Sequence, residues 1–161
     1  MRTRIISAFP GTGKTSFAAD YPDIALDSDS SKFSWCNGPD GLSTKERNPW
    51  FPENYIAHIK ENIGKYEFIF VSTHKEVRDA LLDNCLFFYL IYPDEGHKQD
   101  YLQRFAVRGN SSAFVNLLAE NWSNWLHELT FCGPGCKRIE MVFPYLAEEI
   151  EHIVRSENGE R

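Results

Sequence analysis

One short stretch near the N-terminus constrains this chain more than any other. An apolar run leads into a loop that ends in Gly13, Lys14 and Thr15. A strand, glycines, then Lys-Ser or Lys-Thr, then a helix is the order of a phosphate-binding loop. The pattern departs at one position, because Ala8 stands where the first glycine of such loops usually lies. The stretch therefore predicts a strand, a phosphate-binding loop and a helix in direct succession.

The residue types of this loop suit a polyphosphate ligand. Backbone N–H groups of residues 11–14 can converge on one anion, because glycine permits the close approach and the positive φ that such a nest requires. The helix that follows points the positive end of its dipole toward the same anion. We expect the Lys14 ammonium to reach the β- and γ-phosphates of ATP and the Thr15 hydroxyl to ligate Mg²⁺. The residues expected to bind this cofactor are Gly11, Thr12, Gly13, Lys14 and Thr15.

Composition indicates one globular domain over residues 1–161. The length of 161 residues and a hydrophobic content of 42% allow a substantial core. A net charge of −6, with no basic block, argues against a main role as a duplex nucleic-acid binder. The chain starts without an apolar signal core and contains no segment that approaches a membrane span. We therefore expect a cytoplasmic protein with reduced cysteines and no membrane partner.

Strand-like and helix-like segments alternate along the chain. Helices are expected at residues 14–21, 54–64, 75–83, 95–108, 112–129 and 145–153. Strands are expected at residues 2–7, 23–26, 68–71, 86–92 and 137–142. Residues 32–52 show no clear period and are expected to form a polar, aromatic-rich loop, and the tail from Ser156 is expected to fray. The alternation predicts an α/β fold with a parallel sheet covered on both faces.

Polar segments are expected to meet at one edge of that sheet. Ligands of such sheets bind beyond the carboxyl ends of the strands, where residues 8–15, 27–31 and 72–74 all fall. Asp27 and Asp29 share a face if strand geometry continues, so one could support the metal and the other bind the acceptor or take its proton. The alternative is that this acidic segment only forms a turn or a cap.

The expected strand at residues 68–71 lacks the acidic residue that usually follows it in proteins with such a loop. Ser72, Thr73 and His74 stand there instead. Asp27 or Asp29 could substitute, or the hydroxyls of Ser72 and Thr73 could orient a water in the metal shell. His74 has two interpretations, a polar group of the active site or an ordinary residue at a helix start.

Aromatic and basic side chains supply the remaining candidates. The aromatic residues after the acidic segment could stack an acceptor base or could pin a long loop. Arg104 and Arg108 lie four residues apart on an expected helix and could straddle a triphosphate; a solvated basic face is the alternative. Arg78 is a weaker candidate for an acceptor phosphate. The residues expected at the acceptor are Asp29, Ser31, Phe33, Trp35, Tyr55 and Arg78.

Taken together, these residues resemble small P-loop kinases of the nucleoside monophosphate kinase group, including phage-encoded kinases of deoxynucleotides and of modified thymine bases. The 8–15 loop, the acidic segment at 27–31 and the Arg104–Arg108 pair carry the resemblance. It implies a three-layer P-loop NTPase fold, with a five-stranded parallel sheet whose first strand is central. It also implies an acceptor-binding region at about residues 29–64, a short helical lid at about residues 95–112, and ATP and Mg²⁺ as cofactors.

We therefore expect an ATP-dependent phosphotransferase that moves the γ-phosphoryl group to a (deoxy)nucleoside monophosphate. Lys14 would hold the phosphates, Asp29 would bind or activate the acceptor, and Asp27 would support the metal with Thr15. Arg104 and Arg108 would close over the transferring group.

Two alternatives stay open. The first is a kinase of a hydroxyl acceptor, with Asp29 as general base: a nucleoside, a hydroxymethylated base in DNA, or a polynucleotide end. Nucleic acid would be a partner only in that case. The second is a non-enzymatic nucleotide-binding switch. The oligomeric state is not determined by the sequence.

Overall fold

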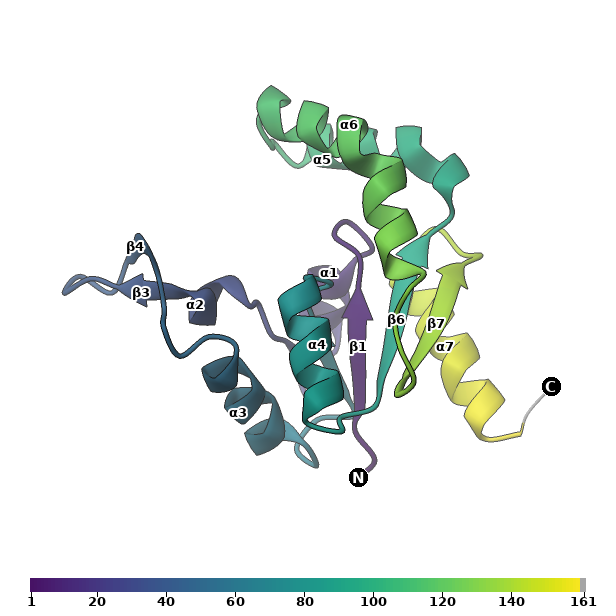
Figure 1. The fold of residues 1–161 in the computed structure, drawn as a ribbon. Coiled ribbons are helices and arrows are strands. Elements are labelled where there is room, and N and C mark those ends of the chain that lie inside the picture. Colours follow the sequence, from purple (N-terminus) through teal and green to yellow (C-terminus); the bar gives the residue numbers. More distant parts are fainter. Residues whose placement is uncertain (160–161) are drawn as a thin grey trace.

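The structure is a computed structural model in which residues 1–159 are described. A five-stranded sheet forms its middle layer, in the order β2-β5-β1-β6-β7, and every neighbouring pair is parallel (Figure 1). The predicted α/β class and the central place of the first strand are confirmed. The strands are β1 (Arg4–Ala8), β2 (Ala25–Asp27), β5 (Phe68–Val71), β6 (Phe88–Pro93) and β7 (Cys136–Met141).

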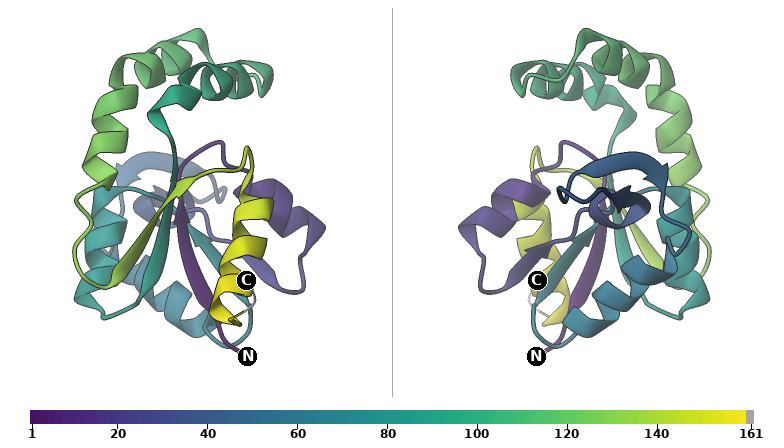
Figure 2. Two further views of the ribbon diagram at one scale, coloured as in Figure 1. Left: turned by 90° about the vertical axis from the view of Figure 1, so that its right-hand side faces the viewer. Right: turned by 90° about the vertical axis from the view of Figure 1, so that its left-hand side faces the viewer.

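Helices cover both faces of the sheet, which gives three layers. Helices α1 and α7 lie on one face, and α3, α4 and α6 lie on the other (Figure 2). Helices α5 and α6 together arch over the rim from which the 8–15 loop emerges (Figure 1). The helices are α1 (Lys14–Asp20), α3 (Glu53–Asn62), α4 (Lys75–Asp83), α5 (Lys98–Val107), α6 (Ser112–Leu129) and α7 (Leu146–Glu157), with a 3₁₀ turn at Glu95–His97.

Successive residues of the central strand serve opposite layers. Ile5 packs in the cluster beneath α4 and α6, whereas Ile6 packs in the cluster beneath α1 and α7. This is the period of two that a strand imposes on its side chains. Because helices cover both faces, all five residues of β1 are buried, and the strand has no polar face.

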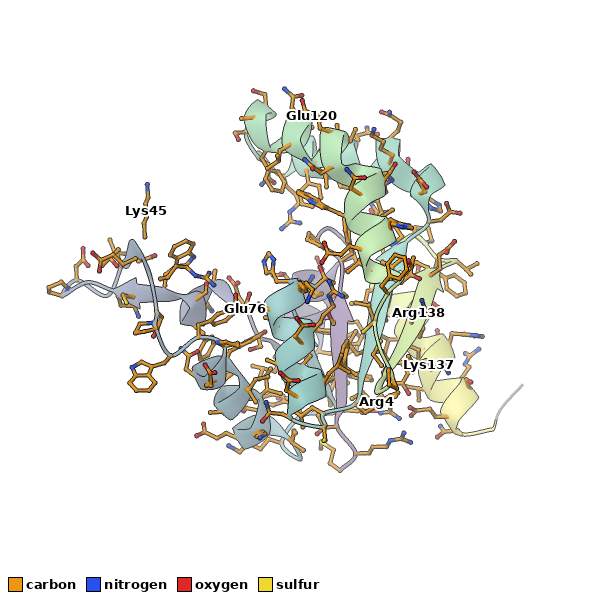
Figure 3. All side chains as sticks on the ribbon, viewed as in Figure 1. Arg4, Lys45, Glu76, Glu120, Lys137 and Arg138 are labelled. Carbon is orange, nitrogen blue, oxygen red and sulfur yellow. The ribbon has the colours of Figure 1, made fainter. Side chains whose placement is uncertain are left out.

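The segment at residues 32–52 differs from the irregular loop that the sequence predicts. A short helix, α2 (Ser31–Ser34), leads into β3 (Trp35–Asn37), which pairs antiparallel with β4 (Ser43–Arg47). This hairpin projects from the body of the molecule, and Lys45 on β4 points away from it (Figure 3). All five residues of β4 are exposed, so no alternation of apolar residues marks the strand. The prediction of a loop without structure is wrong.

The C-terminal helix also runs further than expected, because α7 continues to Glu157. The Glu157 carboxylate lies 2.8 Å from the buried Arg4 guanidinium and accepts a hydrogen bond from the Tyr89 hydroxyl. These contacts anchor the last turn, so the prediction of fraying from Ser156 is wrong for the described part of the tail. Residues 160–161 of the expected tail lie outside the described residues.

The Glu157 contacts predict acid-sensitive stability. Burial alone would raise the pKa of Glu157, but hydrogen bonds from Tyr89 and Arg4 and the charges of Arg4 and Arg2 outweigh it and lower the pKa. The stabilisation is therefore present above the pKa of an unfolded glutamate and is lost as pH falls through the folded value. We expect Glu157→Gln to lower the free energy of unfolding by about 2 kcal/mol at pH 7. The loss should shrink in urea titrations as pH falls through the lowered folded pKa of Glu157.

A matched control comes from the same helix. Among residues 1–159, Glu151 makes one exposed ion pair, with Arg155, so Glu151→Gln should change stability by less than about 0.5 kcal/mol. Equal losses in the two variants would contradict the anchoring role of Glu157.

Candidate functional site

The 8–15 loop joins β1 to α1 at the carboxyl edge of the sheet, and both of its glycines are required by the backbone. Gly11 and Gly13 have φ of 83° and 105°, in the region that other residues rarely adopt. Gly13 is the N-cap of α1. A Cβ at Gly11 would lie 3.1 Å from the Phe105 ring of α5, so the loop also approaches the arch closely. Side chains at either position would disturb the loop.

Thr12 supports the loop from inside. Its side chain is buried, its hydroxyl donates to the Phe9 carbonyl at 2.8 Å, and its N–H is directed to the same oxygen at 3.4 Å. Thr12 does not line the cavities on either side of the loop. Of the five predicted cofactor-binding residues, Thr12 is thus the one that the fold turns inward.

The Lys14 ammonium sits at the centre of the loop. Its Nζ donates to the Ala8 carbonyl at 2.5 Å and to the Phe9 carbonyl at 3.3 Å. Burial lowers the pKa of Lys14 to about 8, although the nearby Asp27 carboxylate opposes the shift. A charge held out of water in this way is favoured again by an anionic partner. The loop is therefore arranged to receive a negative group beside Lys14.

The two residues predicted to support a metal lie in direct contact. The Thr15 hydroxyl donates to the Asp27 carboxylate at 2.7 Å. Asp27 ends β2, in register with Phe70 of β5, so it reaches Thr15 from the neighbouring strand. Next to them, the buried hydroxyls of Ser28 and Ser72 have no hydrogen-bond partner among residues 1–159. A carboxylate, a hydroxyl and two further hydroxyl oxygens form a set of hard oxygen donors that suits Mg²⁺.

A cavity of about 570 Å³, here called the hairpin cavity, opens between these residues and the β3–β4 hairpin. The Asp29 carboxylate in its wall accepts hydrogen bonds from the Ser31 amide at 2.9 Å and from the Ser31 hydroxyl at 2.8 Å. The acidic segment thus forms the turn that one interpretation predicts, and it also lines the cavity; its role toward a metal or an acceptor stays a prediction. The predicted residues that it brings together here are Lys14, Thr15, Asp27, Asp29, Ser31 and Trp35.

Two of the predicted aromatic residues do not line this cavity. Tyr55 is buried and donates its hydroxyl to the Ser28 carbonyl at 2.6 Å. Phe33 packs with its ring centroid 5.2 Å from that of Tyr55 and 4.7 Å from that of His58. Both residues therefore fasten the acidic segment to α3, and the rings that face the cavity are those of Trp35 and Phe51.

Arg47 belongs to the hairpin cavity, although the sequence analysis did not find it. Its guanidinium lies 5.4 Å from the Trp35 ring centroid and 5.2 Å from that of Phe51. It also pairs at 2.8 Å with Glu76, which Figure 3 labels at the start of α4, so this ion pair links the hairpin to α4. The only sequence signal for Arg47 is its place opposite Trp35 in a hairpin that the sequence does not predict.

Arg78 does not reach the acceptor side of the site. It is 5% exposed, pairs with Glu128 of α6 at 2.8 Å and donates to the Thr73 carbonyl at 2.9 Å. It does not line the hairpin cavity. Arg78 lies on α4, and its side chain is directed toward α6 instead of toward Asp29, so its predicted place at the acceptor is wrong.

A second cavity of about 610 Å³, here called the arch cavity, lies on the other side of Lys14 and Thr15, beneath α5. Arg104 in its wall donates to the Gly11 carbonyl at 3.1 Å and to the Pro144 carbonyl at 2.8 Å. The same guanidinium lies 4.3 Å from the Tyr145 ring centroid. Arg104 thus links the arch, the 8–15 loop and the segment before α7.

Arg108 is arranged differently from Arg104, although both line the arch cavity. Within residues 1–159 its guanidinium makes no hydrogen bond, and it stacks 5.5 Å from the Phe105 ring centroid. Its charge is one of the causes that lower the pKa of Lys14. Both arginines line the same cavity from neighbouring turns, but Arg104 donates to two backbone carbonyls, whereas Arg108 makes no hydrogen bond within residues 1–159.

Comparison with known proteins adds no relative, because no family model and no curated protein matches the sequence. Among the described residues, no helix combines the length and the apolar character needed to cross a bilayer. What the chain does must therefore be inferred from its own site.

The buried ammonium predicts an unusual effect on stability. Because its pKa is lowered, Lys14 destabilises the fold below about pH 8, and this cost disappears as pH rises toward the unfolded value of 10.5. We expect Lys14→Met to raise the free energy of unfolding at pH 7 by about 2 kcal/mol. Urea titrations between pH 7 and pH 10 should show the gain shrinking. The exposed Lys32→Met is the control, and a destabilised Lys14→Met at pH 7 would refute the expectation.

Proposed function

We propose that the protein is an ATP-dependent phosphotransferase of the P-loop NTPase class. The observation that carries the proposal is the 2.7 Å hydrogen bond between Thr15 and Asp27 beside the Lys14 ammonium. A phosphate-binding lysine and a pair of metal-binding groups at one strand edge are the parts that phosphoryl transfer requires. Mg²⁺ held by Thr15 and Asp27 would neutralise charge on the β- and γ-phosphates.

The two cavities divide the reactants between them. Lys14 and Thr15 line both, so the transferring group passes from one side of these residues to the other. ATP would bind in the arch cavity. Its adenine ring would stack on the ring of Tyr145, and its phosphates would lie near Arg108. The hairpin cavity takes the acceptor, with the Trp35 and Phe51 rings opposite the acidic segment.

A hydroxyl acceptor is favoured by the charges in the hairpin cavity. The Arg78 guanidinium, which could have met an acceptor phosphate, is turned to Glu128, while the Asp27 and Asp29 carboxylates face the cavity. A hydroxyl oxygen would bond to the γ-phosphorus as the bond from that phosphorus to the β–γ bridging oxygen breaks. The hydroxyl proton would pass to Asp29 and ADP would leave.

A nucleoside monophosphate is the second candidate acceptor, and Arg47 is the observation in its favour. It is the arginine of the hairpin cavity and could exchange Glu76 for an acceptor phosphate. A phosphate nucleophile is already charged and needs no base, so the two candidates assign different roles to Asp29. A nucleotide-binding switch remains the non-enzymatic alternative, recognisable by ATP turnover that no acceptor increases.

The first test concerns Asp29. Replacing a general base lowers the rate of the chemical step. Asp29→Asn should therefore reduce kcat by about 10²–10⁴-fold on a hydroxyl acceptor, with little change in KM. ATP consumption would be followed with a panel of nucleosides, nucleoside monophosphates and hydroxymethylated DNA. Asp40→Asn in the hairpin is the control, because within residues 1–159 the Asp40 carboxylate accepts a hydrogen bond from the Leu42 amide alone and does not line the hairpin cavity. A higher KM with unchanged kcat would make Asp29 a binding group and favour the monophosphate.

The second test separates the two arginines of the arch. Arg108→Ala should lower kcat by about 10²–10³-fold, because Arg108 keeps its donors for the transferring group. Arg104→Ala should mainly raise the KM for ATP, since Arg104 holds the segment that carries Tyr145. Calorimetry with Mg-ATP on the folded wild type and on Lys14→Ala provides the baseline. Absence of Mg-ATP binding by the wild type would overturn the whole proposal.

A further inference from the structure

The proposed reaction leaves one further cavity without a role. It has a volume of about 370 Å³ and lies between the start of α4 and the inner face of α6, two helices on the same face of the sheet (Figure 2). We name it the α4–α6 cavity. Most of its wall is apolar, with Phe9 and Pro10 from the 8–15 loop and Phe114, Leu118, Trp125 and Leu129 from α6.

The chemistry of this cavity fits a flat heteroaromatic ring. Phe114 and Trp125 are both partly buried and offer ring surfaces for stacking. The polar part of the wall includes the Arg78–Glu128 pair, in which the arginine side chain is 6% exposed and the glutamate 50%. A guanidinium beside a carboxylate presents donors and acceptors side by side, as the edge of a nucleobase does.

The α4–α6 cavity adjoins the hairpin cavity. Both are lined by Pro10, Thr73, His74 and Lys75, so they meet at the start of α4. His74 and Lys75 are exposed at this junction. Lys75, which also pairs with Asp79 at 2.5 Å, carries a positive charge where a sugar–phosphate link between the two cavities would have to pass, and His74 offers a ring nitrogen there.

Two sets of aromatic rings therefore flank one reacting point. Trp35 and Phe51 line one side, and Phe114 and Trp125 line the other. A mononucleotide carries one base and fills one of these places. A nucleic-acid strand carries a base on each side of the junction, and base–aromatic stacking is the usual way in which proteins hold single strands.

Resting on the proposed phosphotransferase function, we propose that the acceptor is a nucleotide within a single-stranded nucleic acid. The hairpin cavity takes the reacting nucleotide, and the α4–α6 cavity seats the neighbouring base against Phe114 and Trp125. The net charge of −6 does not oppose this, because the contacts are ring faces and a short cationic junction rather than a broad basic surface.

Equilibrium binding tests the proposal without requiring turnover. A fluorescein-labelled oligothymidylate would be titrated with the protein in the presence of Mg²⁺ and a non-hydrolysable ATP analogue, and anisotropy would be recorded. Unlabelled oligothymidylate should displace the probe at a concentration at least about tenfold lower than thymidine monophosphate does, because the second base adds a stacking contact. Binding should also weaken as salt concentration rises.

Substitutions that keep apolar volume distinguish stacking from packing. Trp125→Leu and Phe114→Leu should each weaken binding of the oligonucleotide by about tenfold and leave the affinity for thymidine monophosphate unchanged. Trp50→Leu is the matched control, because Trp50 is 74% exposed and lies outside the three cavities. Circular dichroism and thermal melts would verify that every variant is folded.

Two outcomes would overturn the inference. The first is equal affinity of the protein for oligothymidylate and thymidine monophosphate. The second is an equal loss of affinity for both ligands in Trp125→Leu, which would mean that the base of the acceptor itself binds in the α4–α6 cavity. Failure of the proposed function has a different signature. In that case the oligonucleotide binds and Trp125→Leu weakens this binding, but no acceptor stimulates ATP consumption.

Discussion

The parallel pairing of β1 with β5 and β6 places every group of the candidate site. It fixes the end of β1 beside the ends of β2 and β5, so that Thr15 and Asp27 meet although twelve residues separate them. The pairing is in turn held by burial, since β1, β5 and β6 are buried along their whole length. Hydrophobic burial of a strand on both faces is insensitive to what lies at its end. The rim is therefore free to carry costly polar groups that a core would exclude.

The polar groups at the rim are costly in a specific way. Lys14 is held out of water with its pKa lowered, and the charge of Arg108 lies close enough to add to that cost. Such an arrangement lowers the stability of the protein without a ligand and becomes favourable once a polyanion lies between the two cations. The opposite end of the sheet is different, because the buried Arg4 guanidinium there is paired with the carboxylates of Glu67 and Glu157. The buried cation at that end therefore has carboxylate partners, whereas Lys14 donates only to backbone carbonyls among residues 1–159.

The sequence predicts the features that depend on local pattern and leaves open those that depend on distant partners. The strands and the 8–15 loop follow from apolar runs and from glycines with positive φ, both of which are local. The β3–β4 hairpin could not be predicted, since its strands are short and β4 is wholly exposed. Helical spacing predicts that Arg104 and Arg108 share a face. It does not predict that Arg104, and not Arg108, donates hydrogen bonds to the carbonyls of Gly11 and Pro144. Arg78 shows the same limit, because the partner that turns it away from Asp29 is fifty residues further along the chain.

The absence of an acidic residue after β5 has a structural counterpart. Asp27 contacts Thr15 from the edge strand β2, so the end of β5 needs no carboxylate and carries Ser72, whose hydroxyl is buried. Ser72 is fastened to the central strand through its backbone, since its carbonyl accepts a hydrogen bond from the Ser7 hydroxyl at 2.9 Å. Small side chains at this position leave the start of α4 uncovered, and that is where the hairpin and α4–α6 cavities join. The rim thus combines a carboxylate on the edge strand, in contact with Thr15, with a small side chain at the end of β5. A carboxylate at position 72 would compete with Asp27 for Thr15 and would narrow the junction through which a strand is proposed to pass.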